Sequence, residues 1–315
     1  MKVLVTPRSF GKTDPEAFEI LRRAGLEIVV NDSGGILGRD DLALRLADCD
    51  GVVLGVDPLD AEIIAKAPRL KAVAKYGVGI DNIDMDACKA RGISVTRTVG
   101  ANADAVADYA FALMMAAARR VVKIDTMCRK GDWTKLTSID INGKTLGILG
   151  MGAIGRGMAA RGRGFAMKIL GYDVFWDEDY AVAAKVKRAT LDEIYHEADF
   201  ISLHVPLNEE TRGMIGREEL AMMKPTAVIV NTARGGIIDE TALLDALKNG
   251  VIYGAGIDAF EKEPPENDEW FKLDNIVLGS HAAASTTGAI ERMGRMAAEN
   301  LVRDLGLAKE EKGNA

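Results

Sequence analysis

The sequence predicts an α/β protein built from two doubly wound, parallel-sheet domains. Short runs of Val, Ile and Leu alternate with helical stretches along nearly the whole chain. Strands buried on both faces of a parallel sheet are continuous apolar runs of this kind, and strand–helix alternation produces right-handed βαβ units. The length of 315 residues also fits two domains, because one domain usually takes roughly 100–200 residues.

The first part of the chain predicts one sheet with helices between its strands. The expected strands are Lys2–Thr6, Glu27–Val30, Gly51–Leu54, Ala72–Lys75 and Ile93–Thr96. The expected helices are Pro15–Ala24, Arg39–Ala47, Asp60–Lys66 and Asp84–Arg91. A longer helix follows at Asn102–Val122, with acidic residues in its early turns and arginines at its end, as the helix dipole favours.

A second series of strands begins at Thr145. The expected strands are Thr145–Leu149, Lys168–Tyr172, Phe200–His204, Ala227–Asn231, Gly254–Asp258 and Asn275–Leu278. This number of parallel strands completes a doubly wound dinucleotide-binding sheet. A last helix is expected at Thr287–Leu305.

Composition excludes several classes of protein. The net charge is −7 without a long Lys/Arg run, which argues against nucleic-acid binding. Three cysteines without a CxxC pair fit a reducing compartment, and three histidines make a zinc site improbable, so we expect no metal. The N-terminus does not resemble a signal peptide, and the longest apolar run is far shorter than the roughly 20 residues of a membrane span. We therefore expect a soluble, cytoplasmic protein.

A glycine-rich turn follows the first strand of the second series. Gly150, Gly152 and Gly155 form G-x-G-x-x-G between a strand and a helix that starts with Ala153 and Ile154. These glycines allow a tight turn, close approach of a pyrophosphate, and close packing of helix on strand. The pyrophosphate would lie on the N–H groups at the helix N-terminus. The sequence therefore predicts a dinucleotide site here.

The next strand in the series is followed by Asp173, which favours NAD over NADP. A carboxylate at this place accepts hydrogen bonds from the adenosine ribose hydroxyls. A 2′-phosphate would be repelled by the carboxylate and would find no cation among Val174, Phe175 and Trp176.

Three polar residues follow later strands, at the edge where open α/β sheets bind ligands. They are Arg234, Glu263 and His281. A cation can hold a carboxylate and polarise a neighbouring oxygen, an imidazole can exchange a proton near neutral pH, and a carboxylate can orient that imidazole. This combination is typical of hydride transfer on a hydroxy acid. Each residue alone also fits a structural role: a salt-bridge partner, a solvated glutamate and a capping histidine.

The whole chain resembles the D-isomer-specific 2-hydroxyacid dehydrogenase family, most closely its phosphoglycerate dehydrogenase-like branch. The motifs that carry the resemblance are YGVGIDNID, GANADAVADYAF, GILGMGAIG, HVPLNEETRGMIG, VNTARGGIIDE, GIDAFEKEPP and GSHAAAST. The resemblance implies a discontinuous, flavodoxin-like substrate domain of residues 1–98 and 284–315, and an NAD-binding domain of residues 99–283. It also implies closure of the two domains and a homodimer formed through the NAD-binding domain, including the helix at Asn102–Val122.

The resemblance also implies roles for individual residues. The catalytic residues of the family fall on Arg234, Glu263 and His281. Its nicotinamide-contacting aspartate falls on Asp258, and Thr232 and Ala233 flank the nicotinamide ribose. The adenine side falls on His204, Val205, Pro206 and Thr211. The backbone amides of Val78 and Gly79 would bind the substrate carboxylate, with Asn102 near the hinge.

The implied reaction moves a hydride between C2 of a D-2-hydroxy acid and nicotinamide. In oxidation His281 accepts the hydroxyl proton, Glu263 stabilises the imidazolium, and Arg234 fixes the carboxylate and the C2 oxygen. General acid–base help of this kind contributes roughly 10²–10⁴-fold.

The substrate is expected to be 3-phosphoglycerate, or 3-phosphohydroxypyruvate in reduction, which would place the chain in serine biosynthesis. The chain departs from that branch where Lys75 replaces an arginine. Lys75 and Arg8 either contact a phosphate or are surface bases at strand ends. One alternative is reduction of hydroxypyruvate or glyoxylate by the same chemistry. Another, of a different class, is an NAD-sensing protein like the family's transcriptional corepressors.

Overall fold

The computed structural model describes residues 1–308 of the chain. These residues form two compact units, one of residues 1–102 and 285–308 and the other of residues 103–284. Residues 309–315, which the sequence prediction adds to the substrate domain, lie outside the described residues.

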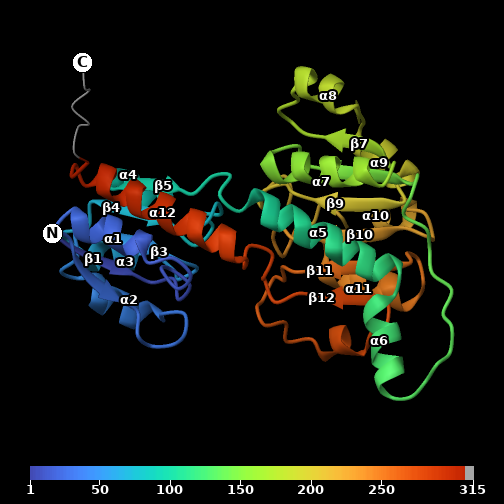
Figure 1. The fold of residues 1–315 in the computed structure, drawn as a ribbon, viewed down its shortest axis with the longest axis horizontal. Coiled ribbons are helices and arrows are strands. Elements are labelled where there is room, and N and C mark those ends of the chain that lie inside the picture. The colour runs from blue at the N-terminus through green and yellow to red at the C-terminus, as the bar shows by residue number, and fades with distance from the viewer. Residues whose placement is uncertain (309–315) are drawn as a thin grey trace. The chain divides into compact units, whose positions relative to one another are not determined.

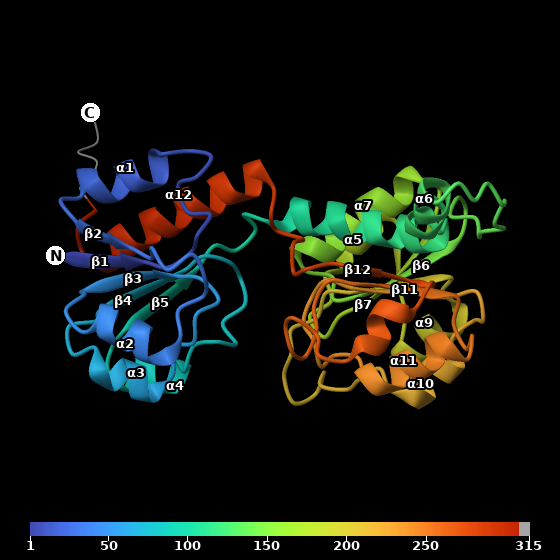
Figure 2. The same ribbon diagram turned by 90° about the horizontal axis from the view of Figure 1, so that it is seen from below.

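The first unit is a five-stranded parallel sheet in the order β2-β1-β3-β4-β5. Its strands are β1 Lys2–Val5, β2 Glu27–Val30, β3 Gly51–Leu54, β4 Ala72–Lys75 and β5 Ser94–Arg97. Its helices are α1 Glu16–Arg23, α2 Arg39–Leu46, α3 Ala61–Lys66, α4 Met85–Ala90 and α12 Thr287–Asp304. Figure 2 shows α1 and α12 on one face of the sheet and α2, α3 and α4 on the other. This strand order is the flavodoxin-like one.

The last helix of the described chain completes this first unit. Helix α12 packs on α1 and on strands β3, β4 and β5. Leu301 and Leu305 are buried in the core formed with Val3, Val5 and Ala72. Burying a leucine side chain contributes roughly 1.5–3 kcal/mol, so this face of the sheet depends on a segment distant in sequence.

The second unit is a seven-stranded parallel sheet in the order β12-β11-β10-β9-β6-β7-β8. Its strands are β6 Thr145–Leu149, β7 Lys168–Tyr172, β8 Val186–Arg188, β9 Phe200–Leu203, β10 Val228–Asn231, β11 Gly254–Ile257 and β12 Ile276–Leu278. Counted from β6, this order is the dinucleotide-binding order 3-2-1-4-5-6 with one further strand. The predicted fold class of two doubly wound parallel sheets is confirmed for the described residues.

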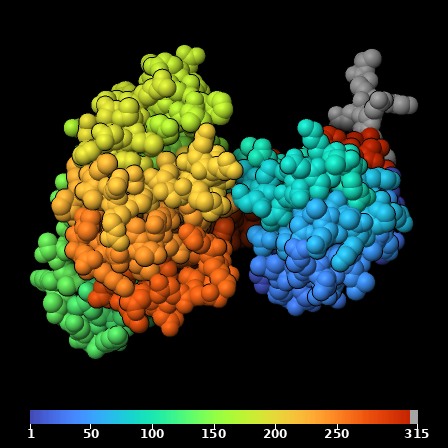
Figure 3. Space-filling model, turned by 180° about the vertical axis from the view of Figure 1, so that it is seen from behind, coloured from blue at the N-terminus to red at the C-terminus, as the bar shows by residue number. Residues whose placement is uncertain are grey.

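Helices cover both faces of the second sheet. They are α5 Ala103–Ala118, α6 Val121–Arg129, α7 Ala153–Gly164, α8 Glu178–Ala184, α9 Leu191–Glu197, α10 Arg217–Met222, α11 Glu240–Lys248 and the short 3₁₀ helix η1 Asp268–Lys272. Helices α5 and α7 lie on one face and α9, α10 and α11 on the other (Figures 1 and 2). In Figure 3 the yellow and orange segments that include α10 and α11 form much of the visible surface of this unit.

Two elements differ from the sequence prediction. The single helix expected at Asn102–Val122 is wrong: α5 ends at Ala118, and α6 starts at Val121. Arg120 between them has a left-handed φ of 53°, and its guanidinium stacks on the ring of Tyr253 and donates to its hydroxyl at 2.8 Å. The three-residue edge strand β8 was not expected either, because a strand this short leaves little pattern.

Candidate active site

An imidazole and a carboxylate form a close pair just beyond strands β11 and β12. His281 Nδ1 lies 2.9 Å from both Glu263 Oε1 and Oε2. Both side chains are partly exposed, at 42% and 38%. Because Glu263 occupies Nδ1, the other ring nitrogen, Nε2, is the one available for proton exchange with a bound molecule.

The surroundings of Glu263 fix its carboxylate in place and favour its ionised form. The backbone N–H of Phe260 donates to Oε1 at 3.1 Å. Burial acts to raise the pKa of Glu263, but the His281 hydrogen bond and charge, the Phe260 amide and the charge of Arg234 outweigh it and hold that pKa below its usual range. Glu263 is therefore an anion at neutral pH.

Asp258 holds the loop that carries His281. Its buried carboxylate accepts the amides of Ala282 and Ala283, each at 3.0 Å, and its carbonyl accepts the amide of His281 at 2.9 Å. His281 has a φ of 56°, a conformation that costs a non-glycine residue energy and persists only where its surroundings impose it. Burial raises the pKa of Asp258, and the Ala282 and Ala283 amides act against that rise.

Arg234 lies in the turn after β10. Asn231, the last residue of that strand, donates from its side-chain amide to the Arg234 carbonyl at 2.7 Å and accepts the Ala233 amide at 3.0 Å. The Arg234 charge contributes to the low pKa of Glu263, so the guanidinium acts on the same pair. The fold thus brings Arg234, Glu263 and His281 together at the carboxyl edge of the second sheet, where the sequence expects them.

The glycine turn has the shape that a dinucleotide requires. Gly150 has a φ of +96°, and a Cβ there would lie 2.7 Å from the His204 carbonyl. A Cβ on Gly155 would lie 2.0 Å from the Gly150 oxygen, so helix α7 can approach β6 only because that side chain is missing. At Gly152, the N-cap of α7, a Cβ would meet nothing within 4 Å. That open space at a helix N-terminus fits a pyrophosphate.

Asp173 stands beside this turn. Its carboxylate accepts the Met151 amide at 2.6 Å and the Phe175 amide at 2.8 Å, so it also fixes the turn itself. Arg156 also supports this turn, which the sequence did not predict. Its Nε donates to the Met151 carbonyl at 3.1 Å, and its guanidinium stacks on the ring of Tyr180. Only its position in the first turn of α7 could have signalled it.

Two buried polar atoms beside the turn have no protein partner among the described residues. They are His204 Nδ1 and Thr232 Oγ1. His204 Nε2 lies 2.9 Å from Ser202 Oγ, and burial lowers the pKa of His204 to about 3. Orphaned polar atoms of this kind fit a ligand that supplies the missing hydrogen bonds. Of the loop that follows, Val205 packs into the core, Pro206 is exposed, and Thr211 Oγ1 donates to the Pro206 carbonyl at 2.6 Å.

The first unit carries the loop that the sequence analysis expects to bind a substrate carboxylate. The backbone amides of Val78 and Gly79 are in a partly exposed loop after β4 and have no partner in the part of the chain that the structure describes. Gly77 has a φ of +137°, and its backbone N–H donates a hydrogen bond to Thr98 Oγ1 at 2.9 Å, which fixes this residue. Adjacent unpaired amides form an anion-binding concavity. Asn102, at the end of this unit, is partly exposed.

The two bases that the sequence analysis considers for phosphate differ in setting. Lys75 is buried at 5% exposure, and its ammonium binds the Gly55 carbonyl and, at 2.8 Å, Asn82 Oδ1. Arg8 is exposed and donates to the Gly34 carbonyl at 3.0 Å. A contact of either residue with substrate stays a prediction.

No group of His, Cys, Asp and Glu residues within 1–308 is arranged to hold a metal ion. Over the same residues, no helix has the length and apolar character that crossing a bilayer requires.

Comparison with known proteins identifies the family. Residues 111–283 match the model of the D-isomer specific 2-hydroxyacid dehydrogenase NAD-binding domain. The glyoxylate reductase of Korarchaeum cryptofilum is 49% identical over 266 residues, covering 82% of this chain and 80% of the relative.

Solved structures agree with that match. A glyoxylate reductase from Paecilomyes thermophila has a TM-score of 0.86 at 31% identity and covers 99% of this chain and 96% of its own. The D-lactate dehydrogenase of Aquifex aeolicus, in complex with NAD and lactic acid, has a TM-score of 0.81 at 32% identity. The match covers 94% of this chain and 93% of the dehydrogenase.

This chain belongs to the D-isomer-specific 2-hydroxyacid dehydrogenase family, and residues 111–283 are its NAD-binding domain. The predicted family and cofactor are confirmed. The predicted phosphoglycerate dehydrogenase-like branch is not supported: the relatives named here favour the alternative, a glyoxylate reductase.

Proposed function

We propose that this chain reduces glyoxylate, and the related hydroxypyruvate, to the corresponding 2-hydroxy acid with NADH. The observation that carries the proposal is the His281–Glu263 pair at 2.9 Å beside the NAD-binding sheet, with Arg234 close enough to influence it. The choice of substrate is supported by the 49% identical glyoxylate reductase. It is also supported by Lys75, whose ammonium is buried against Gly55 and Asn82 rather than presented for a phosphate.

The proposed roles rest on the chemistry of each group. Arg234 holds the substrate carboxylate and polarises the C2 oxygen, and the amides of Val78 and Gly79 bind the carboxylate. His281 Nε2, in its imidazolium form, donates the proton that the C2 oxygen needs as it becomes an alkoxide. Glu263 keeps the proton on Nδ1 and stabilises the imidazolium. Bound NADH supplies the hydride to C2, so the products are a 2-hydroxy acid and NAD⁺.

The NAD-binding residues are part of the same proposal. Gly150, Gly152, Ala153, Ile154 and Gly155 would hold the pyrophosphate, and Asp173 the adenosine ribose. Residues His204, Val205, Pro206 and Thr211 would line the adenine side, and Thr232, Ala233 and Asp258 the nicotinamide side. We also propose a cytoplasmic homodimer. Exposed apolar residues on and after α6, namely Val121, Val122 and Trp133, support an interface of the NAD-binding domain.

A substrate panel tests the proposed reaction. NADH oxidation is measured with glyoxylate, hydroxypyruvate and 3-phosphohydroxypyruvate under the same conditions. We expect kcat/KM for glyoxylate or hydroxypyruvate to exceed that for the phosphorylated acid by about tenfold or more. The reason is that a substrate phosphate without a partner in the site is a buried polar group left unpaired, which costs about 1–3 kcal/mol. The His281→Ala variant should lose roughly 10²–10⁴-fold in kcat. A preference for 3-phosphohydroxypyruvate would return the assignment to the phosphoglycerate branch.

A further inference from the structure

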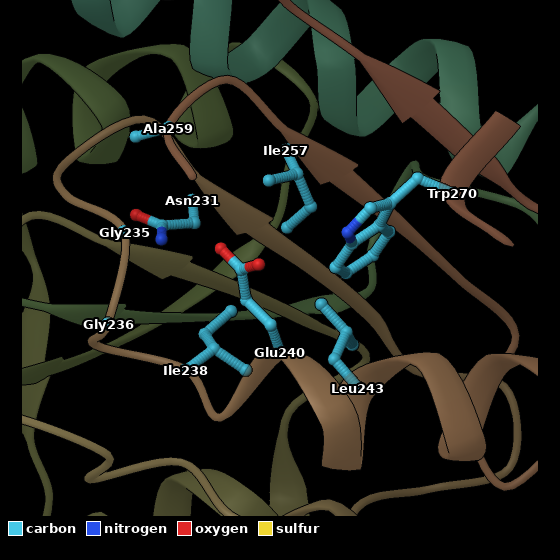
Figure 4. A pocket seen from close by; sticks show the side chains of 9 residues that line it. All are labelled: Asn231, Gly235, Gly236, Ile238, Glu240, Leu243, Ile257, Ala259 and Trp270. Atoms are coloured by element: carbon cyan, nitrogen blue, oxygen red, sulfur yellow. The ribbon is translucent and has the colours of Figure 1, made fainter. Parts of the chain in front are cut away.

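A small cavity lies beneath the two loops that carry Arg234 and Glu263. Its volume is about 10 Å³, and its walls include Asn231, Gly235, Ile257 and Trp270. Figure 4 shows the Glu240 side chain entering this space from the start of α11, with its carboxylate between Asn231 and Ile257. A space of this size holds about one water molecule, so it is not a substrate site.

Glu240 binds the loop that positions Glu263. Its Oε1 accepts the backbone N–H of Glu261 at 2.6 Å. The neighbouring amide, that of Phe260, is the one that donates to Glu263 Oε1. Two consecutive N–H groups of one loop therefore connect Glu240 on one side with Glu263 and His281 on the other.

The loop of Arg234 also packs against the Phe260–Glu261 peptide. A Cβ on Gly235 would lie 2.0 Å from the Phe260 carbonyl carbon and 2.2 Å from the Glu261 nitrogen. The loop of Arg234 and the loop of Glu263 are thus in close contact at this peptide, and Phe260 is anchored by an edge-to-face contact with Trp270 at 5.6 Å. Loss of the Glu240 hydrogen bond would release one of the few restraints on this peptide.

The Glu240 carboxylate interacts electrostatically with the same loop. Burial raises its pKa, the hydrogen bond from the Glu261 amide acts against this, and the charges of Glu261 and Glu263 raise it further.

We infer that Glu240 is a positioning residue for the proposed reduction: it fixes the Phe260–Glu263 loop so that Glu263 holds His281. The inference rests on the proposed function for its catalytic readout. The property of Glu240 that matters here is its acceptor oxygen, and single substitutions isolate that property.

Glu240→Gln keeps an acceptor oxygen and removes the charge, whereas Glu240→Ala removes both. With glyoxylate, Glu240→Ala should lower kcat about tenfold or more, because small displacements of catalytic groups are costly, and should leave the KM for NADH within about twofold. Glu240→Gln should recover most of that kcat.

Glu218→Gln is the matched control, because Glu218 is an exposed glutamate in the first turn of the neighbouring helix α10. It should match the wild type in every readout. Thermal melting of each variant shows whether Glu240→Ala folds, and Glu240→Gln carries the test if it does not.

Nuclear magnetic resonance spectra of the His281 ring give a readout that does not need turnover. Because Glu263 fixes this ring, its signals should shift in Glu240→Ala and stay near their wild-type positions in Glu240→Gln. If the wild type reduces none of the 2-oxo acids, the proposed function fails while these spectra still test Glu240. Wild-type kcat in Glu240→Ala, unmoved His281 signals in Glu240→Ala, or a Glu240→Gln variant as slow as Glu240→Ala would overturn the inference.

Discussion

At the scale of single residues, two of the three histidines of the second unit have opposite settings. His281 is partly exposed and paired with an anion. His204 is mostly buried, with one ring nitrogen bonded to Ser202 and the other without a partner among the described residues. Their surroundings assign them different tasks. The first is placed to exchange a proton with a bound molecule, whereas the second stays neutral and serves as a hydrogen-bonding group.

The buried His204 should make the protein less stable in acid. Its pKa in the folded chain is about 3, below the roughly 6.5 of an unfolded histidine. Between these values the unfolded chain binds the proton and the folded chain does not, so stability falls as pH falls through that window. In His204→Gln, this part of the pH dependence, on the order of 2–3 kcal/mol between pH 6.5 and 4, should disappear.

Urea unfolding at pH 7, 5.5 and 4 measures the effect. His196→Gln serves as the control, because His196 is exposed on α9. Parallel stability curves for His204→Gln and the wild type would show that His204 does not govern the acid response.

At the scale of elements, the turn between β6 and α7 separates two uses of glycine. Gly155 is required by the fold, since its Cβ would collide with the Gly150 carbonyl. Gly152 is not required by the fold, because the space around it is open. The second glycine therefore has its purpose in what binds there.

Three alanine substitutions test this separation. Gly155→Ala should destabilise the protein by about 1–3 kcal/mol through steric overlap. Gly152→Ala should leave the melting temperature near that of the wild type but weaken NADH binding, measured by calorimetric titration, by about tenfold or more, since the new methyl group occupies the path of the pyrophosphate. Gly164→Ala, at the open end of α7, is the control and should be neutral or stabilising by up to about 1 kcal/mol. Equal effects of Gly152→Ala and Gly155→Ala on stability would contradict the assignment.

The strands were predictable from sequence because they are short apolar runs. Gly51–Leu54 and Thr145–Leu149 form the strands expected, and their residues are buried on both faces. Glu27–Val30 also forms the strand expected, although it lies at the edge of its sheet and is partly exposed. The break between α5 and α6 was not predictable, since it depends on Arg120 stacking on Tyr253, which is distant in sequence. A helical pattern reports local preference, and a tertiary contact overrides it here.

The candidate catalytic residues were identified because each follows a strand and carries reactive chemistry. Their supporting residues were not. Glu240 looks like an ordinary first-turn glutamate in the sequence, and its role comes from a loop that the fold brings against it. Lys75 looked like a phosphate ligand as readily as a surface base, and only the structure shows its ammonium buried against Gly55 and Asn82.

At the scale of the whole molecule, the two units have separate hydrophobic cores. One pair of cores lies on the two faces of the first sheet, and the other pair on the two faces of the second. Separate cores favour separate unfolding transitions. The NAD-binding domain lies within one unit, so a bound dinucleotide should act on one transition.

Differential scanning calorimetry with NADH tests this expectation. At about 100 times its Kd, NADH should stabilise one transition by about 2.7 kcal/mol. Leu301→Ala, in α12, should lower the other transition by about 2–5 kcal/mol, because it leaves a cavity in the core of the first unit. Leu244→Ala, buried in α11, should lower the transition that NADH raises. A single transition shifted by all three changes would mean that the units unfold as one.

The place of α12 in the first unit also affects how the protein is made. A ribosome finishes residues 1–102 long before it reaches Thr287–Asp304. During that interval the apolar side of β3 and β4 that α12 will cover has nothing to cover it. The nascent chain therefore exposes an apolar surface throughout synthesis of the second unit. Chaperones that bind emerging polypeptides should recognise this surface until α12 leaves the ribosome and covers it.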